Sequence, residues 1–199
     1  MTLPSQGGQS KGDRTRAALI AAAVIRFARE GLRGTSVADV CRDAGLSTTA
    51  SYPYFANKEA LFVAAVDEDV AGLIDDAVHL VGIQSDLHWG HTMMLNLIDR
   101  MSAHPLARRI VSGLEPEFTM RLLDIPALDQ LRKGVAELMR SLQVTGEVRA
   151  DVDPEQMASG LVVIVISLLM ATMQTGGTEF ARVAADIEAV LDAATRPPT

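Results

Sequence analysis

The chain has one cysteine, Cys41, among its 199 residues. A single cysteine excludes an intrachain disulfide, so folding does not call for an oxidising compartment. Cys41 falls on the apolar face of an expected helix, and only Arg42 beside it is basic. The sequence therefore favours a small buried hydrophobic side chain over a redox-sensing thiolate.

Catalytic patterns are missing too. The chain has no glycine-rich phosphate loop, no G-x-S-x-G elbow and no pairing of a nucleophile with a base. His88 and His91 are three residues apart, with His104 and an Asp76-x-x-His79 pair nearby. Zinc needs three or four converging ligands, and a di-metal bundle needs two Glu-x-x-His repeats. We therefore expect no enzyme activity, no metal and no cofactor.

Strand patterns are absent as well, whereas apolar residues make up 48% of the chain and recur with a period near 3.6. This predicts an all-α protein of about nine helices. We expect an unfolded arm over residues 1–12, a three-helix helix-turn-helix DNA-binding domain over 13–57, and a helical ligand-binding and dimerisation domain over 58–199. The expected helices are 13–30, 36–43, 48–54, 58–81, 87–103, 106–112, 127–143, 154–175 and 178–194.

The stretch from Ala44 to Phe62 is the part of the sequence that says most about function. Just before it, Ser36 and Asp39 have the spacing of a capping box, which predicts the start of a helix at residue 36. Gly45 can adopt a positive φ, which predicts the end of this helix. Ser47 can cap the next helix at once. A turn this short sets the second helix steeply across the first, so that it can enter a major groove about 12 Å wide.

Small or hydroxylated side chains and no charge characterise this second helix, over residues 48–54. They can approach base edges closely, while phosphate contacts must come from Lys58, in a helix capped by Asn57, and from amides near Thr35. The residues expected to bind DNA are Thr35, Ser36, Val37, Ser47, Thr48, Thr49, Ala50, Tyr52, Pro53, Tyr54 and Lys58. The alternative is a buried helical connector with solvated hydroxyls.

These residues resemble the TetR family of bacterial transcriptional regulators over the segment from about Arg14 to Val66. The resemblance rests on Phe27, Gly31, Thr35 to Val37, Ala44 to Ser47, Tyr52, Tyr54, Phe55 and Asn57 to Leu61. It implies a homodimeric, usually repressing protein that a ligand releases from DNA. It also implies that Tyr52, Tyr54 and Phe55 supply an aromatic wedge and phosphate-directed hydroxyls.

Two residues depart from the family pattern. Ser51 stands where a large apolar residue is common, which predicts weaker anchoring of the reading helix. Pro53 stands where a long polar or basic side chain is frequent, and it removes the amide that would bond the Thr49 carbonyl. Both departures affect specificity for bases.

Charge is divided unevenly along the chain. Residues 1–60 hold eight basic and five acidic side chains, a net +3, and the rest hold ten basic and twenty acidic, a net −10. This asymmetry would orient the protein on a polyanion. Arg14 and Arg16, next to the arm, are further candidates for phosphate contact, with a solvated tail as the alternative.

An apolar run covers residues 161–173, with only Ser167 and Thr172 as polar interruptions. It is short for a membrane span, which takes about 18 or more residues, so we expect a buried helix that starts at Asp153 and Pro154. This helix and the next are more apolar than one chain can cover, which predicts pairing with their copies in a symmetric dimer. The expected contacts are Val162, Ile166, Met170, Val183, Ile187 and Val190; an intrachain core is the alternative.

Soft apolar side chains are concentrated between the linker helix and these last two helices. Methionine adapts its shape readily, so this region suits a pocket for an apolar or aromatic small molecule. The expected lining is Trp89, His91, Met93, Met94, Leu97, Met101, Phe118 and Leu122, with a filled core as the alternative.

These expectations together describe a cytoplasmic, homodimeric transcriptional regulator. It would repress from a pseudo-palindromic double-stranded operator until an apolar or aromatic effector releases it, without a membrane partner. The competing interpretation is a helical carrier or sensor of small molecules with a degenerate DNA-binding lobe, in which Ser51 and Pro53 mark the decay. Salt-sensitive, sequence-selective DNA binding would separate the two.

Overall fold

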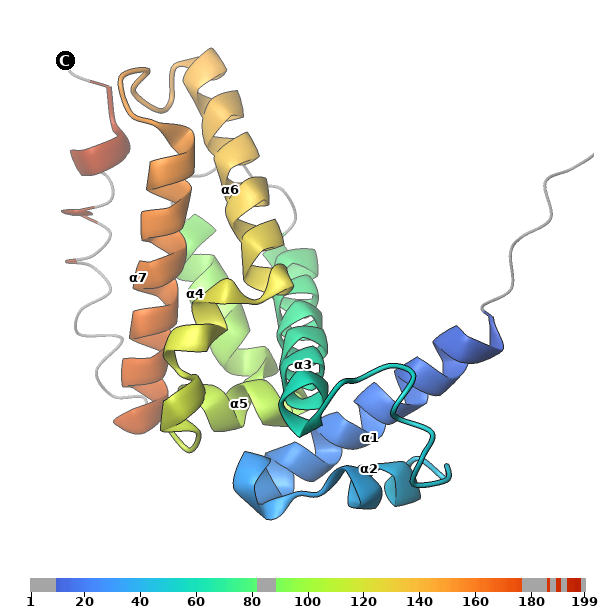
Figure 1. The fold of residues 1–199 in the computed structure, drawn as a ribbon. Helices are drawn as coiled ribbons and strands as arrows, with labels where there is room; N and C mark the ends of the chain where they lie inside the picture. The colour runs from blue at the N-terminus through green and yellow to red at the C-terminus, as the bar shows by residue number, and fades with distance from the viewer. Residues whose placement is uncertain (1–9, 82–88, 177–185, 187–188, 191–192, 198–199) are drawn as a thin grey trace, which may run out of the picture. The chain divides into compact units, whose positions relative to one another are not determined.

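A computed structural model describes residues 10–81, 89–176, 186, 189–190 and 193–197 (Figure 1). Within these residues the protein is all-helical and has no β-strand, which confirms the expected fold class. The chain divides into two compact units, residues 1–66 and 67–199. The division falls inside α3 (Lys58–Val81), so the first turns of α3 pack with the smaller unit rather than with the larger one.

The smaller unit contains α1 (Lys11–Gly34), α2 (Val37–Asp43) and the start of α3. Ser10 and Asp13 form a capping box, so α1 begins before the expected residue 13, and residues 10–12 do not belong to an arm. Residues 1–9 lie outside the described residues. Gly31, with φ +74°, interrupts α1 where the sequence predicted its end.

Aromatic packing forms the centre of this unit. Phe27 of α1 and Phe62 of α3 meet edge to face, with ring centroids 5.0 Å apart. Cys41 is fully buried, as expected, and its thiol lies 3.7 Å from the Thr48 carbonyl. Because these side chains fix α2 and α3 against α1, the unit has a core of its own.

The larger unit contains the rest of α3 and a bundle that matches the expected helices closely. Its elements are α4 (Trp89–Arg100), α5 (Pro105–Val111), α6 (Pro126–Thr145) and α7 (Pro154–Gln174), with short 3₁₀ turns at Met101–Ala103, Pro116–Phe118 and Met120–Asp124. The turns between residues 116 and 124 were not expected. The helix expected over 178–194 lies mostly outside the described residues, of which 186, 189–190 and 193–194 are helical.

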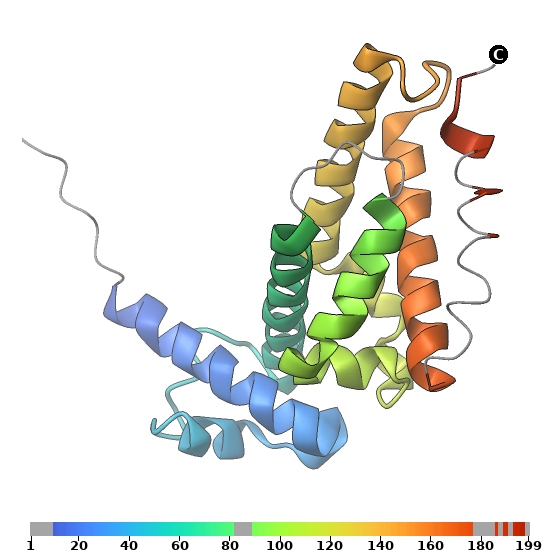
Figure 2. The same cartoon turned by 180° about the vertical axis from the view of Figure 1, so that it is seen from behind.

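Helices α6 and α7 lie side by side in both views (Figures 1 and 2). Gly146, in the left-handed region, ends α6, and the Asp153 carboxylate caps α7 as expected. Between the two helices lies an apolar cluster that includes Met139, Leu142 and Leu161. Burial of these side chains supplies the main attraction within this pair.

Helix α7 is less buried than the sequence predicted. Val163 and Ile164 are 42% and 36% exposed in the single chain. By length and composition α7 could cross a membrane, and only 28% of its apolar window is buried. Core helices of soluble proteins pass the same test, so this is weak evidence for a span. One face of α7 thus has no cover from the described residues of a single chain, and the burial that the sequence predicted would require the second copy that the same prediction included.

Carboxylates of α3 hold the starts of two other helices. Asp69, only 7% exposed, accepts the amides of Leu106 and Ala107 at 2.8 Å, at the first turn of α5. Asp67 accepts the Ala127 amide at 2.8 Å, at the first turn of α6. Both carboxylates satisfy amides that have no partner within their own helices.

His104 adds a second link between α3 and the start of α5. Its Nδ1 lies 3.4 Å from Asp69 Oδ1, and its Nε2 lies 3.3 Å from Asp76 Oδ2. Gly72 makes room for the ring, because a Cβ there would come within 2.9 Å of its Cε1. Among the residues that the structure describes, no group of three His, Cys, Asp or Glu side chains could hold a metal ion.

We expect Asp69→Ala to destabilise the larger unit by about 2–4 kcal/mol, because two buried amides would lose their acceptor. Urea unfolding followed by circular dichroism measures this. Asp75→Ala, an exposed carboxylate on the same helix, is the matched control and should change stability by less than about 0.5 kcal/mol. Equal effects of the two substitutions would contradict the capping role.

Candidate nucleic-acid interface

Arg26 fastens α1 to the end of α2. Its guanidinium donates from Nε to Asp43 Oδ2 at 2.7 Å and from Nη2 to Asp43 Oδ1 at 2.8 Å. Its Nη1 donates to both oxygens of Glu30, at 2.9 and 3.1 Å. A bidentate pair of this kind fixes the orientation of the guanidinium and the carboxylate as well as the distance between them. Arg26 thus holds the C-terminal end of α2, from which the turn leaves.

Helix α2 and its turn follow the sequence-based prediction. The Ser36 hydroxyl accepts the Asp39 amide, and the Asp39 carboxylate in turn accepts from Ser36, so the capping box is formed. Gly45 has φ +68°, and the amide of Leu46 returns to the Cys41 carbonyl at 2.9 Å. These bonds close the helix end and begin the short connection.

Residues 48–54, which we name the reading segment, do not form the expected α-helix. They form a run of turns, with Ala50 donating to the Ser47 carbonyl at 3.0 Å and Tyr54 donating to the Ser51 carbonyl at 2.9 Å. The Ser47 hydroxyl lies 3.3 Å from the Thr49 hydroxyl, which is not the amide cap that we expected. Pro53 explains part of the difference, since it has no amide to donate to Thr49 and disfavours helical backbone at Tyr52.

The reading segment and its flanks are exposed at most of the expected positions. Ser36, Ser47, Thr48, Thr49, Tyr52 and Pro53 are exposed, and Val37, Ala50 and Tyr54 are half-buried. The Thr35 side chain is 3% exposed and its hydroxyl has no hydrogen-bond partner, whereas the sequence predicted contact through its backbone amide. Only the backbone of Thr35 could therefore reach DNA.

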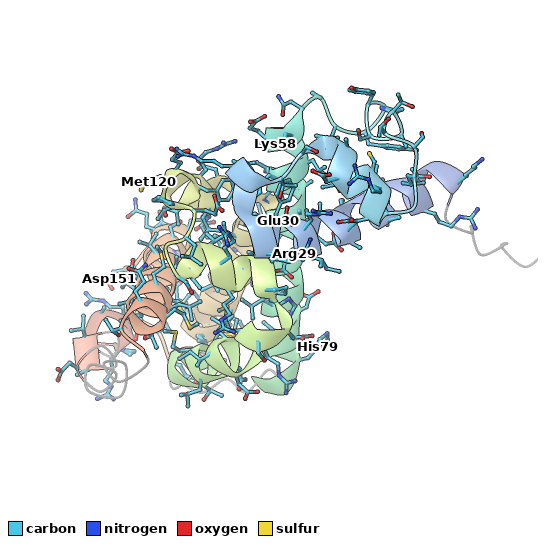
Figure 3. The ribbon with its side chains drawn as sticks, turned by 90° about the horizontal axis from the view of Figure 1, so that it is seen from below. Arg29, Glu30, Lys58, His79, Met120 and Asp151 are labelled. Carbon is cyan, nitrogen blue, oxygen red and sulfur yellow. The ribbon has the colours of Figure 1, made fainter. Side chains whose placement is uncertain are left out.

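Lys58 begins α3 beside the turn that ends α1 (Figure 3). Its ammonium donates to the Leu32 carbonyl at 2.8 Å. An ammonium group has three donors, so this bond leaves capacity for a phosphate. Asn57 accepts the Ala60 amide at 2.8 Å, which confirms it as the cap of α3. Lys58 thus makes a structural bond that was not expected, and its phosphate contact stays a prediction.

The start of α1 lies against the end of the reading segment. The Arg16 guanidinium sits 5.7 Å from the centre of the Phe55 ring, within cation–π range. A Cβ on Gly12 would lie 3.5 Å from the Tyr54 hydroxyl. Arg14 and Arg16 are both exposed, so their charges are available near the reading segment.

Ion pairs stabilise the charged forms of three carboxylates in this unit. The Arg26 guanidinium holds the pKa of Asp43 below its ordinary range. Bonds from Arg29 and then Arg26 lower the pKa of Glu30, and the Ser36 hydroxyl, followed by Arg42, lowers the pKa of Asp39. Figure 3 shows Arg29 and Glu30 together on α1. These acids therefore stay ionised well below neutral pH.

The expected effector-lining residues lie in the larger unit. Six of them are buried with exposed fractions of 2–5%, namely Met93, Met94, Leu97, Met101, Phe118 and Leu122. The side chains of Trp89 and His91 lie outside the described residues. Burial of this kind fits both a pocket lining and a filled core.

The residues expected to form the dimer contact differ in how exposed they are. Val162 is a correction, because it is 3% exposed and covered within its own chain. Ile166 and Met170 are half-buried, Val190 is 66% exposed, and Val183 and Ile187 lie outside the described residues. The sequence analysis missed Val163 and Ile164, whose exposure distinguishes them from their neighbours.

Two further groups escaped the sequence analysis. The Ser10 to Asp13 capping box could have been found from its spacing, which is the same as that of Ser36 and Asp39. The pairing of Arg26 with Asp43 carries no such local pattern, because the two residues are 17 positions apart.

Two helices joined by a tight turn, followed by an exposed hydroxyl-rich segment and a capped third helix, are the parts of a helix-turn-helix DNA-binding domain. Residues 19–65 match the model of a family described as bacterial regulatory proteins, tetR family. The DNA-binding domain of this chain is therefore a TetR-family domain.

One curated relative and the solved structures extend the similarity beyond the DNA-binding domain. An uncharacterised HTH-type transcriptional regulator of Bacillus subtilis, YdgC, is 25% identical over 193 residues, covering 90% of this chain and 91% of that protein. The HTH-type transcriptional repressor KstR2 of Rhodococcus jostii is 36% identical over 76 residues, covering 38% of this chain and 35% of that one. A TetR-family regulator from Pectobacterium atrosepticum has the same fold, with TM-score 0.69 and 21% identity over 97% of this chain and all of that one. The protein is a transcriptional regulator.

We expect the stability of the smaller unit to fall as the pH drops from 7 towards 3. A carboxyl group whose folded pKa lies below its unfolded value stabilises the fold above the unfolded pKa, and this contribution is lost as pH falls through the folded one. Asp43→Asn should lower the melting temperature at pH 7 and flatten its dependence on pH. An unchanged slope in Asp43→Asn would contradict the clamp.

Proposed function

We propose that this regulator is a homodimeric repressor that works in the cytoplasm and binds a pseudo-palindromic DNA operator. The observation that carries the proposal is the row of exposed hydroxyls at Ser47, Thr48 and Thr49, presented next to an α1–α2 scaffold that Arg26 clamps. Small hydroxylated side chains can bond base edges in the major groove. The name of the Rhodococcus relative, a repressor, supports the direction of regulation.

Phosphate contacts would come from the flanks of the reading segment. Lys58 follows the segment in the sequence, and the exposed Arg16 lies over the Phe55 ring just after it, with the exposed Arg14 two residues away on α1. The exposed Tyr52 and half-buried Tyr54 can add hydroxyl contacts. Contacts of this type position the protein on DNA, whereas Thr48 and Thr49 would distinguish base sequences.

Dimerisation would use the exposed face of α7. Two apolar side chains of α7 are exposed in the single chain, Val163 and Ile164, and so is Val190, which follows α7 in the sequence. Ile166 and Met170 of α7 are half-buried. Covering such a face removes apolar surface from water, and a two-fold axis would present two reading segments to two half-sites.

The effector would be an apolar or aromatic small molecule bound among the methionines of α4 and of the 3₁₀ turn that follows it. Met93, Met94 and Met101 are buried together with Leu97, and methionine side chains reshape easily around a guest. Ligand and DNA would then oppose each other reciprocally, with a coupling of typically about 1–3 kcal/mol. No catalytic role is proposed.

The carrier interpretation has one observation in its favour, which is the irregular reading segment. A scaffold that no longer reads DNA could tolerate Pro53 and a buried serine at position 51. Titration of the full-length protein against the DNA that flanks its coding region, with a scrambled duplex and two salt concentrations, separates the two functions. Selective binding supports the repressor, and equal binding to both duplexes supports the carrier.

Lys58→Ala and Thr49→Ala should differ in this titration. Loss of the Lys58 phosphate contact should weaken binding to selected and scrambled duplexes alike and reduce the salt slope by about 1. Thr49→Ala should instead change the ranking of single-base variants of the selected duplex, by about 1–3 kcal/mol at the affected position.

Two controls keep this comparison interpretable. Lys133→Ala removes an exposed lysine of α6, in the larger unit, and should leave binding unchanged. A melting curve of Lys58→Ala tests whether loss of its bond to Leu32 unfolds the smaller unit. Equal loss on both duplexes for both variants would contradict the assigned roles.

We expect Ile164→Glu to convert the dimer into a monomer, because it places a charge in the apolar contact of α7. Analytical ultracentrifugation gives the mass directly. Val144→Glu changes an apolar residue that is 89% exposed and should leave the mass unchanged. A dimer that survives Ile164→Glu at micromolar concentration would place the interface elsewhere.

A further inference from the structure

We propose that the reading segment becomes a regular helix only on DNA, that Pro53 prevents the helix in the free protein, and that the unsatisfied Ser51 hydroxyl favours the change. The inference rests on the proposed function, because it needs a DNA operator to complete the transition. It makes these two residues determinants of affinity and specificity rather than marks of decay.

The hydrogen bonds of the reading segment are those of separate turns. The bonds from Ala50 to Ser47 and from Tyr54 to Ser51 span three residues, and only the bond from Phe55 to Ser51, at 3.0 Å, spans four. Helix α2, with the same number of residues, is regular and has a complete capping box. Length alone therefore does not prevent a helix here; the missing amide cap and the proline distinguish the two segments.

Pro53 blocks the helix from inside the segment. It cannot donate to the Thr49 carbonyl, its ring crowds that carbonyl, and it disfavours helical backbone at Tyr52. The exposed Thr49 carries no backbone bond across the turn, so its carbonyl can accept from a donor outside the protein. A base edge in the major groove offers such donors on cytosine and adenine.

The buried hydroxyl of Ser51 destabilises the turn conformation relative to a helix. Its side chain is 1% exposed, and its hydroxyl has no hydrogen-bond partner. A buried hydroxyl without a partner destabilises the conformation that contains it. In a regular helix a serine hydroxyl can donate to the carbonyl four residues earlier, which here is Ser47. Helix formation would therefore satisfy a group that the turns leave unsatisfied.

DNA supplies the remaining stabilisation. Contacts of the exposed Thr48 and Thr49 side chains with DNA would offset the loss of the amide at Pro53. Ordering the segment on binding costs free energy, which lowers affinity but lets the segment adapt to different operator sequences. We therefore expect the reading segment to bind DNA with low affinity and low sequence selectivity, while Arg26 keeps α1 and α2 in place.

Amide hydrogen exchange of the full-length protein, free and bound to the duplex selected by the titration, tests the transition. In the free protein the amides of Ala50, Ser51 and Tyr52 should exchange much faster than those of Val40 and Cys41 in α2. In the complex they should slow by about tenfold or more. Amides that are already as protected as α2 in the free protein would overturn the proposal.

Pro53→Ala tests the cause. It should protect the same amides in the free protein and tighten binding to the selected duplex by about tenfold, well within the helix penalty of an interior proline. Pro116→Ala, an exposed proline at the start of a 3₁₀ turn in the larger unit, is the control and should change neither quantity. Ser51→Ala should raise the melting temperature of the free protein, because it removes the unsatisfied hydroxyl.

The remaining outcomes separate this proposal from the proposed function. Unchanged affinity and unchanged protection in Pro53→Ala would overturn the proposal while leaving a regulator that still binds its duplex. Binding by Pro53→Ala alone, with no selective binding by the natural protein, would overturn both and support the carrier. If neither protein binds selectively although Pro53→Ala gains protection, the proposed function fails and the transition on DNA fails with it.

Discussion

The constraint on which this structure depends is the need to satisfy the free amides at the start of each helix. Ser10 and Ser36 do this for α1 and α2, Asn57 for α3, and Asp153 for α7. For α5 and α6 the acceptors are Asp69 and Asp67, which project from α3. Oxygen acceptors at these positions decide where the helices begin, and in the larger unit they also decide what the helices pack against.

Sequence position determines which of these caps can be predicted. A cap within three residues of its amide leaves a local pattern, and for this reason Ser36, Asn57 and Asp153 were found and the starts of α2, α3 and α7 were predicted to within one residue. Asp69 reaches an amide 37 residues away and Asp67 one 60 residues away, so no pattern indicates either. The Arg26 clamp on Asp43 escaped prediction for the same reason.

The candidate site, too, could be predicted from the sequence only where its features depend on local residue types. Its position in the chain, the glycine turn and the exposed hydroxyls of Ser47 to Thr49 followed from local residue types. The irregular backbone of the reading segment did not, although the loss of one amide at Pro53 was foreseen, because the sequence does not show whether DNA, a cap or packing offsets that loss. Burial at Thr35 and Val162 and exposure at Val163 depend on how whole helices are rotated, which an apolar run does not reveal.

Helix α3 takes part in both units because the division of the chain falls within it. Its first turn bonds the end of α1 through Lys58, and further along Asp67, Asp69 and Asp76 hold α6, α5 and His104. Under the proposed function, an effector that displaces α5 or α6 must either move α3 or break buried charge-assisted bonds, and moving a helix as a body costs less than leaving amides unsatisfied. Under the proposed function, the carboxylates of α3 would therefore pass a displacement of α5 or α6 on to α3 itself, without a change in the fold of the larger unit.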